Sequence, residues 1–193
     1  MKRILLSLVT LSLALSAQAA VETYKIDPTH SSVSFRIRHI LTKIPGEFTK
    51  FQGTVLVDRE NLEKSSTDAT IDVTSVNTRD EKRDTHLKSP DFFQAEKFPT
   101  ISFKSKNWKK TGENTFDVTG DLTIKGVTKE VVLKTKSLGF SPGMRPGSSV
   151  SGWEGTTTVT RKDYGMVLTN PMMEKAIGED VDVTITVEAG LEK

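Results

Sequence analysis

The feature that most limits how this chain can fold is the alternation of apolar and polar residues. It is clearest from Val181 to Val187, where Val and Ile alternate with Asp and Thr. A period of two places successive side chains on opposite faces of a β-strand, so one face is buried and the other meets water. We count eight or nine such segments, and their even spacing predicts an antiparallel barrel or sandwich.

One segment breaks the alternation. Thr78 is followed three residues later by Glu81, which predicts a capping box and a short helix over residues 81–88. Pro90 ends the helix, because the residue before a proline disfavours helical geometry. Hairpin turns are expected at 110–114 and 125–127, and irregular stretches at 137–152 and 169–178.

The N-terminus has the pattern of an export signal. Lys2 and Arg3 precede an uncharged apolar run from Ile4 to Leu15, and Ala17-Gln18-Ala19 follows. This order is typical of a cleavable signal peptide over residues 1–19, with the mature domain over 20–193. The apolar run is too short to span a bilayer, and no later run is long enough, so no transmembrane segment is expected after processing.

Charge and cysteine content exclude several classes of protein. Removing Lys2 and Arg3 from the 27 basic residues leaves 25, which equals the 25 acidic residues. A mature chain without net charge has no bulk positive field for nucleic acid, so no nucleic-acid partner is expected. The absence of cysteine rules out disulfides, thiolate metal sites and cysteine catalysis.

The charged residues between the apolar ones favour a barrel in water over one in a membrane. Arg36, Lys134, Lys136 and Asp182 occupy positions that would face lipid in an outer-membrane barrel. Each charge at mid-depth would cost about 2–4 kcal/mol there. A barrel of this size is either filled by its own side chains or holds one small ligand, and alternation alone favours the filled interior.

Catalytic and metal-binding patterns are missing. There is no Gly-x-Ser-x-Gly elbow, no nucleotide-binding glycine loop and no His-Glu-x-x-His motif. Asp84 and His86 could serve acid–base or metal chemistry, but residues two apart on a helix do not share a face. The simpler interpretation is that Arg83 and Asp84 tie the helix to nearby backbone while His86 bonds locally. We therefore expect no catalytic residue, no metal and no cofactor.

Several motifs follow one another along nearly all of the mature chain. They are Ile26–Ser31 with Val33, Phe35 and His39, then Ser75–Thr78, Arg83–Phe93, Phe98–Phe103, Gly120–Lys129, Arg161–Met166 and Ile177–Val181. Together, in this order, they resemble the YceI family of exported lipocalin-like proteins. Residues 140–149 fall outside this pattern.

The resemblance implies an all-β, antiparallel eight-stranded lipocalin-like barrel with one short helix between strands. It also implies a long apolar tunnel that holds a polyisoprenoid, an isoprenoid quinone or a fatty-acid-type lipid. A non-enzymatic carrier, storage or sequestration role in the periplasm, a link to stress and a homodimer are further implications. The alternatives are an enzyme acting on such a lipid, with His86 or Asp84 as acid–base groups, and a ligand-free interaction module.

The expected tunnel combines inward strand positions with residues near the helix and in the loops that follow. Methionines suit such a tunnel because thioethers adapt to irregular ligands, although ordinary packing explains them equally well. Arg83 and His86 are candidates for the headgroup or mouth. The predicted tunnel residues are Val33, Phe35, Ile37, Phe48, Phe51, Phe92, Phe93, Ile101, Phe103, Leu122, Ile124, Leu133, Trp153, Met166 and Met172.

Overall fold

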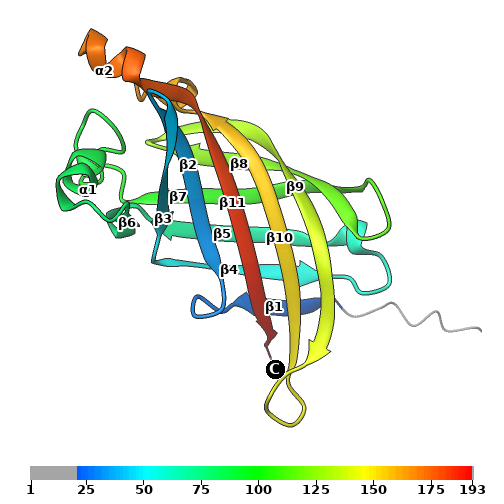
Figure 1. The fold of residues 1–193 in the computed structure, drawn as a ribbon. Coiled ribbons are helices and arrows are strands. Elements are labelled where there is room, and N and C mark those ends of the chain that lie inside the picture. The colour runs from blue at the N-terminus through cyan, green and yellow to red at the C-terminus, as the bar shows by residue number, and fades with distance from the viewer. Residues whose placement is uncertain (1–20, 193) are drawn as a thin grey trace, which may run out of the picture.

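A computed structural model describes residues 21–192 of the chain (Figure 1). The expected signal peptide, residues 1–19, lies outside the described residues. Within them, none of the helices has the length and apolar character needed to cross a bilayer.

Residues 21–192 form eleven strands in one antiparallel sheet that closes on itself, because β1 pairs with both β4 and β11. The strands are β1 (Glu22–Ile26), β2 (Ser32–His39), β3 (Thr42–Phe48), β4 (Phe51–Val57), β5 (Ser66–Asp72), β6 (Val76–Asn77), β7 (Thr100–Lys110), β8 (Thr115–Ile124), β9 (Val127–Pro142), β10 (Ser149–Thr160) and β11 (Ile177–Leu191). Short helices connect some of them: η1 (Leu62–Lys64), η2 (Val73–Ser75), α1 (Glu81–Lys88), η3 (Arg161–Tyr164) and α2 (Pro171–Ala176).

Three of the barrel's eight long strands are interrupted. β1 and β2 run one after the other along β11, β3 and β4 form the next strand, and β5 and β6 form the third. Each long strand therefore pairs with its neighbours in sequence, and the predicted eight-stranded antiparallel barrel is confirmed.

The predicted helix over 81–88 is confirmed as α1, but its capping is different from the expected capping box. Asp80 is the N-cap, and its carboxylate accepts a hydrogen bond from the backbone N–H of Arg83 at 3.1 Å. Thr78 instead donates its backbone N–H and its hydroxyl to the Asp84 carboxylate. Aspartate is a stronger N-cap than threonine, and Asp80 immediately precedes Glu81, the first residue of α1.

The two-residue turn between β8 and β9 lies where it was predicted. Lys125 and Gly126 both have positive φ, as a type I′ hairpin requires, and glycine suits the second position. The turn at 110–114 likewise joins β7 to β8.

The predicted loop over 137–152 is wrong. β9 continues to Pro142 and β10 begins at Ser149, so only residues 143–148 lie outside the strands. Gly139, at φ +102°, and Gly152 lie opposite each other where the register shifts, so these glycines form a bulge rather than a loop. The stretch 169–178 is not irregular throughout, since it contains α2, capped by Asn170.

An apolar cavity inside the barrel as the candidate functional site

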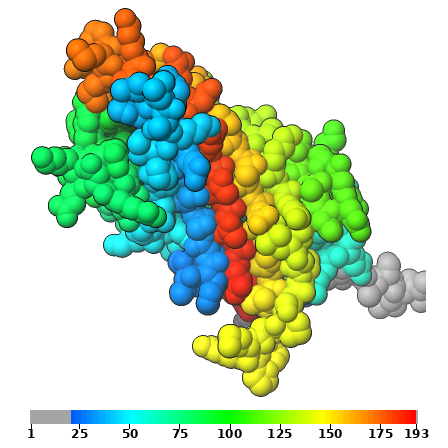
Figure 2. All heavy atoms as spheres, viewed as in Figure 1, coloured from blue at the N-terminus to red at the C-terminus, as the bar shows by residue number. Residues whose placement is uncertain are grey.

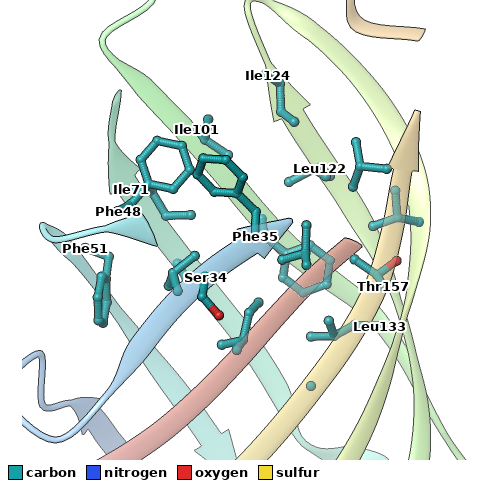
Figure 3. A pocket seen from close by; sticks show the side chains of 18 of the residues that line it. Ser34, Phe35, Phe48, Phe51, Ile71, Ile101, Leu122, Ile124, Leu133 and Thr157 are labelled. Atoms are coloured by element: carbon teal, nitrogen blue, oxygen red, sulfur yellow. The ribbon is translucent and has the colours of Figure 1, made fainter. Parts of the chain in front are cut away.

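The barrel encloses a cavity of about 240 Å³, and apolar side chains form almost all of its wall. In Figure 3, Phe35 on β2, Leu122 on β8 and Leu133 on β9 point into the same space from different strands. The alternation-based preference for a filled interior is therefore wrong, because alternation determines which residues face inward but not whether they meet.

A glycine on β3 creates part of the wall. A Cβ atom at Gly46 would lie 2.2 Å from the ring of Phe35, its cross-strand partner. Only glycine therefore leaves the Phe35 ring room to lie across β3. Phe35 also packs on Phe48 with the ring centroids 5.7 Å apart.

Aromatic side chains fill one end of the barrel. Trp108 meets Trp153 edge-on with the ring centroids 5.3 Å apart, and Phe140 meets Trp153 at 5.9 Å. Phe140 also contacts Tyr24, and the guanidinium of Arg59 lies 4.2 Å from the centroid of the Phe140 ring. Since both tryptophans line the cavity and are only 4% exposed, they form its floor.

The helix α1 and the segment after it contribute the opposite wall. Leu87, Phe92 and Phe93 all line the cavity, and Phe93 packs on Phe48 with the ring centroids 5.7 Å apart. The cavity is partly open to solvent. Because aromatic rings occupy the floor, we place the opening at the end that carries α1.

Arg161 is the one buried charged residue that lines the cavity within the described part of the chain. Its guanidinium donates to the carbonyl oxygens of Gly178 and Met166 and to the carboxylate of Glu174, at 2.9, 2.5 and 2.9 Å. Hydrogen bonds from Lys162 and Arg161 lower the pKa of Glu174 to about 2. This network joins η3, α2 and β11 at the end of the barrel opposite the floor, so it has a structural use.

Three buried side-chain polar atoms lack a hydrogen-bond partner among residues 21–192: Trp108 Nε1 at the floor, Tyr164 Oη in η3 and Glu174 Oε1. Of these, Glu174 Oε1 still has an ion-pair partner, because it lies 2.7 Å from Lys162 Nζ. Burial raises the pKa of Tyr164 to about 12, with a smaller contribution from the charge of Asp163. Trp153, by contrast, donates its Nε1–H to the Ser151 hydroxyl at 3.0 Å. The cavity wall thus offers a ligand few hydrogen-bonding groups.

The polar residues of α1 bond to their own neighbourhood. Arg83 donates to the hydroxyl and the carbonyl oxygen of Thr78 at 2.7 and 2.8 Å. His86 Nε2 lies 2.9 Å from the Asp91 carboxylate, and its ring meets Phe92 edge-on. This agrees with the simpler interpretation, in which the cluster anchors α1. Neither Arg83 nor His86 lines the cavity, so a headgroup role for them stays a prediction.

One group in the described part of the chain has metal-ligand spacing, and the sequence analysis did not identify it. His30 Nδ1 lies 2.9 Å from an Asp27 carboxylate oxygen and 3.9 Å from Glu188. The hydrogen bond that the His30 ring donates to the Asp27 carboxylate raises the pKa of His30. His30 is exposed, Asp27 and Glu188 are half-exposed, and an ion pair accounts for their arrangement without a metal.

All of the predicted tunnel residues except Met172 line the cavity, so the placement of Met172 in the tunnel is corrected. It lies on α2 and is 82% exposed, because α2 projects beyond the ends of the strands (Figure 1). Met166, in contrast, is only 5% exposed and reaches the cavity wall from the segment after η3.

Several lining residues were missed. Those of β11 follow the clearest alternation in the chain, which was a usable signal. Alternation could not identify Trp108, because a register shift between Ser105 and Asn107 changes which residues of β7 face inward after Phe103. The missed lining residues include Val55, Ala69, Ile71, Trp108, Val118, Val131, Thr135, Thr157, Arg161, Val181, Val183, Ile185 and Val187.

Comparison with known proteins supports the same fold. Residues 24–189 match the family model of the YceI-like domain. The chain is 38% identical to Protein YceI of an Escherichia coli strain, over the full length of both. It is 31% identical to the crystal structure of the Campylobacter jejuni YceI protein, which superposes with a TM-score of 0.71 over 79% of this chain and 87% of the other.

A more distant structure shares the fold. A polyisoprenoid binding domain from Saccharophagus degradans, implicated in plant cell wall breakdown, superposes with a TM-score of 0.66 at 15% identity. It covers 88% of this chain and 98% of the other. The family match over nearly all described residues, with the confirmed barrel, shows that the chain belongs to the YceI family.

Proposed function

We propose that this protein binds one long-chain isoprenoid, or a similar amphiphilic lipid, inside its barrel and carries, stores or sequesters it without chemical change. The observation that carries the proposal is the partly open apolar cavity between the aromatic floor and α1. Each CH₂ group moved from water into such a wall gains about 0.8 kcal/mol. The cavity therefore favours a hydrocarbon tail and needs little directional chemistry.

The polar groups of the wall support an uncharged tail within the barrel. Arg161 already has carbonyl and carboxylate partners, so its guanidinium is not left for a phosphate. Thr157 faces the cavity between apolar neighbours and offers only a hydroxyl. A charged headgroup would lose its hydration here without gaining hydrogen bonds or an ion pair. The headgroup therefore belongs at the open end.

The ligand class is supported by the likeness to the polyisoprenoid binding domain from Saccharophagus degradans, which shares the fold. Isoprenoid quinones and fatty-acid-type lipids have the same amphiphilic character and belong to the proposal. No cofactor is part of it. A non-catalytic role is supported by the separation of His86 and Asp84 from the cavity wall, since acid–base chemistry requires contact with the reacting atoms.

The proposal includes export to the periplasm after cleavage behind Ala19, supported by the order of charge, apolar run and small residues at the N-terminus. It also includes a stress-related role and a homodimer, both as implications of family membership. Sequencing the N-terminus of the purified protein tests the cleavage, and its native molecular mass tests the dimer.

The chain's only two tryptophans, Trp108 and Trp153, both line the cavity, which provides a direct binding assay. A naphthoquinone with a geranylgeranyl tail should quench their emission when added to delipidated protein, saturating at one molecule per chain. Leu122→Lys should abolish this saturable quenching, because a charged side chain would enter the apolar cavity.

The matched control is Thr123→Lys, which places the same residue on the outer face of β8, where Thr123 bonds to Thr128. Wild-type protein that shows no saturable quenching would contradict lipid binding. Recovery of a chemically altered quinone would instead favour the enzyme, and its loss in a His86→Ala variant would assign the reaction to that residue.

A further inference from the structure

The turn between β2 and β3 departs from the residue types usually found in a two-residue hairpin turn. Its two residues are Ile40 and Leu41, 58% and 92% exposed. Ile40 has a φ of +52°, a conformation that β-branched residues rarely adopt, and a two-residue hairpin with positive φ only at its first position favours glycine there. Two exposed apolar residues lower solubility, and Ile40 stands where the turn geometry favours glycine. Their presence therefore indicates that these side chains have a function.

More exposed apolar side chains lie beside this turn. The backbone N–H of Ile40 donates to the carbonyl oxygen of Ala176 at 2.7 Å, which joins the turn to the end of α2. Met172 on α2 is 82% exposed, and Val167 shortly before α2 is 56% exposed. We call Ile40, Leu41, Val167 and Met172 the apolar tip. In Figures 1 and 2, α2 and the β2–β3 turn lie together at one end of the molecule.

Basic side chains flank the apolar tip. Residues 31–46 contain Arg36, Arg38 and Lys43 but no acidic residue. Arg38 donates through Nη1 to the carbonyl oxygen of Ile40 at 3.1 Å, which holds its guanidinium at the turn. Lys175 on α2 is exposed. Within the described residues, neither Arg38 nor Lys175 forms an ion pair, so both charges are available to an external anion.

Three of the four nearby carboxylates on α2 and at the start of β11 form ion pairs, and the fourth, Asp180, accepts a hydrogen bond from the Thr160 hydroxyl. Glu174 pairs with Arg161 and Lys162, Glu179 also pairs with Lys162, and Asp182 pairs with Lys43. The apolar tip therefore combines exposed apolar side chains with a local excess of positive charge. An anionic bilayer surface matches both properties, because apolar side chains enter the boundary between headgroups and acyl chains while cations meet the headgroups.

We propose that the apolar tip docks the protein on the surface of an anionic lipid bilayer. A second copy of the chain fits less well, since a symmetric contact through this tip would bring the Arg38 residues of both copies together. Docking requires only side chains outside the cavity, so it does not depend on the proposed function. It would place the bilayer next to the cavity end that contains Ile37, three residues before Ile40.

Vesicle sedimentation tests this proposal with protein purified from cells that express the full chain. Vesicles of phosphatidylethanolamine and phosphatidylglycerol supply the anionic surface, and phosphatidylcholine vesicles supply the neutral one. The test variant is Ile40→Gly with Leu41→Ser, which removes the apolar side chains and gives the turn the glycine that its geometry favours. It should unfold at or above the wild-type temperature, so lost binding cannot be attributed to misfolding.

The matched control is Met144→Ser. Met144 is fully exposed in the loop between β9 and β10, at the other end of the molecule (Figure 1). We expect the turn variant to lose at least about tenfold in affinity for anionic vesicles, and Met144→Ser to bind like the wild type. Wild-type binding should weaken in high salt and on phosphatidylcholine.

Equal sedimentation of the wild type and the turn variant would overturn the proposal. A wild-type dimer that the turn variant converts to a monomer, without vesicle binding by either, would also overturn it and assign the apolar tip to a second copy. Saturable quinone binding in solution with no vesicle binding would refute docking and leave the proposed function intact.

Discussion

Filling the cavity from Thr157 offers the sharpest mutational test of lipid binding. Thr157 lies on β10 and faces the cavity near Leu133 (Figure 3), and its hydroxyl forms no hydrogen bond to another described residue. Thr157→Phe therefore adds an apolar ring to empty space without breaking a polar contact.

The magnitude follows from the volume that the ring takes from the ligand. Phenylalanine has about four more heavy atoms than threonine, and each displaced CH₂ group loses about 0.8 kcal/mol of burial. The variant should therefore bind a long-chain lipid about 3 kcal/mol more weakly, which is about a hundredfold in the dissociation constant.

Quenching of Trp108 and Trp153 by the geranylgeranyl naphthoquinone measures this difference. The control is Thr158→Phe, which places the same ring one residue later, on the exposed outer face of β10. Unfolding of Thr157→Phe at or above the wild-type temperature would show that the cavity accepts the ring. An unchanged dissociation constant in that folded variant would refute the assignment of the cavity as the lipid site.

Three further predictions concern the residues around the cavity. Glu174→Gln should lower the unfolding temperature at neutral pH; since the pKa of Glu174 falls from 4.5 to about 2 on folding, the difference should fade as the pH drops through that range. Tyr164→Phe should stabilise the protein by about 1 kcal/mol, because it removes a buried hydroxyl with no partner among the described residues. The pKa of Tyr164 is about 12 in the folded state and 10 otherwise, so the wild type should lose stability relative to this variant as the pH rises from 10 to 12. Replacing Phe35 with Lys should abolish quinone quenching as Leu122→Lys does, and folded Phe35→Lys protein with unchanged quenching would show that this ring does not meet the ligand.

Strand alternation predicted the barrel wall well because one rule determines both burial and direction. A residue that points inward on a strand of a closed barrel must face the interior, as Phe35 and Leu122 do. The rule fails where a bulge shifts the phase, which is why Trp108 at the floor was missed. The glycines of residues 137–152 led to the wrong prediction of a loop for a related reason, since Gly139 and Gly152 form a bulge within continuing strands.

Loops and helix ends were harder to predict, because their side chains have no fixed period. Met166 and Met172 are equally apolar, yet one reaches the cavity and the other lies exposed on α2. The difference depends on contacts between distant segments, such as the Arg161–Glu174 pair that joins η3 to α2. The presence of the cavity itself also depends on how far the strands lie apart, which local sequence does not encode.

Native mass spectrometry of protein purified from cells that express the full chain would show whether the barrel holds a lipid. Extraction with organic solvent and identification of the released lipid should follow on the same sample. We expect a mass excess of one lipid per chain with a long apolar tail, absent or strongly reduced in Thr157→Phe and retained in Thr158→Phe. A wild-type protein that is purified without a lipid, and that takes up none when mixed with the quinone, would refute lipid binding and favour a ligand-free interaction module.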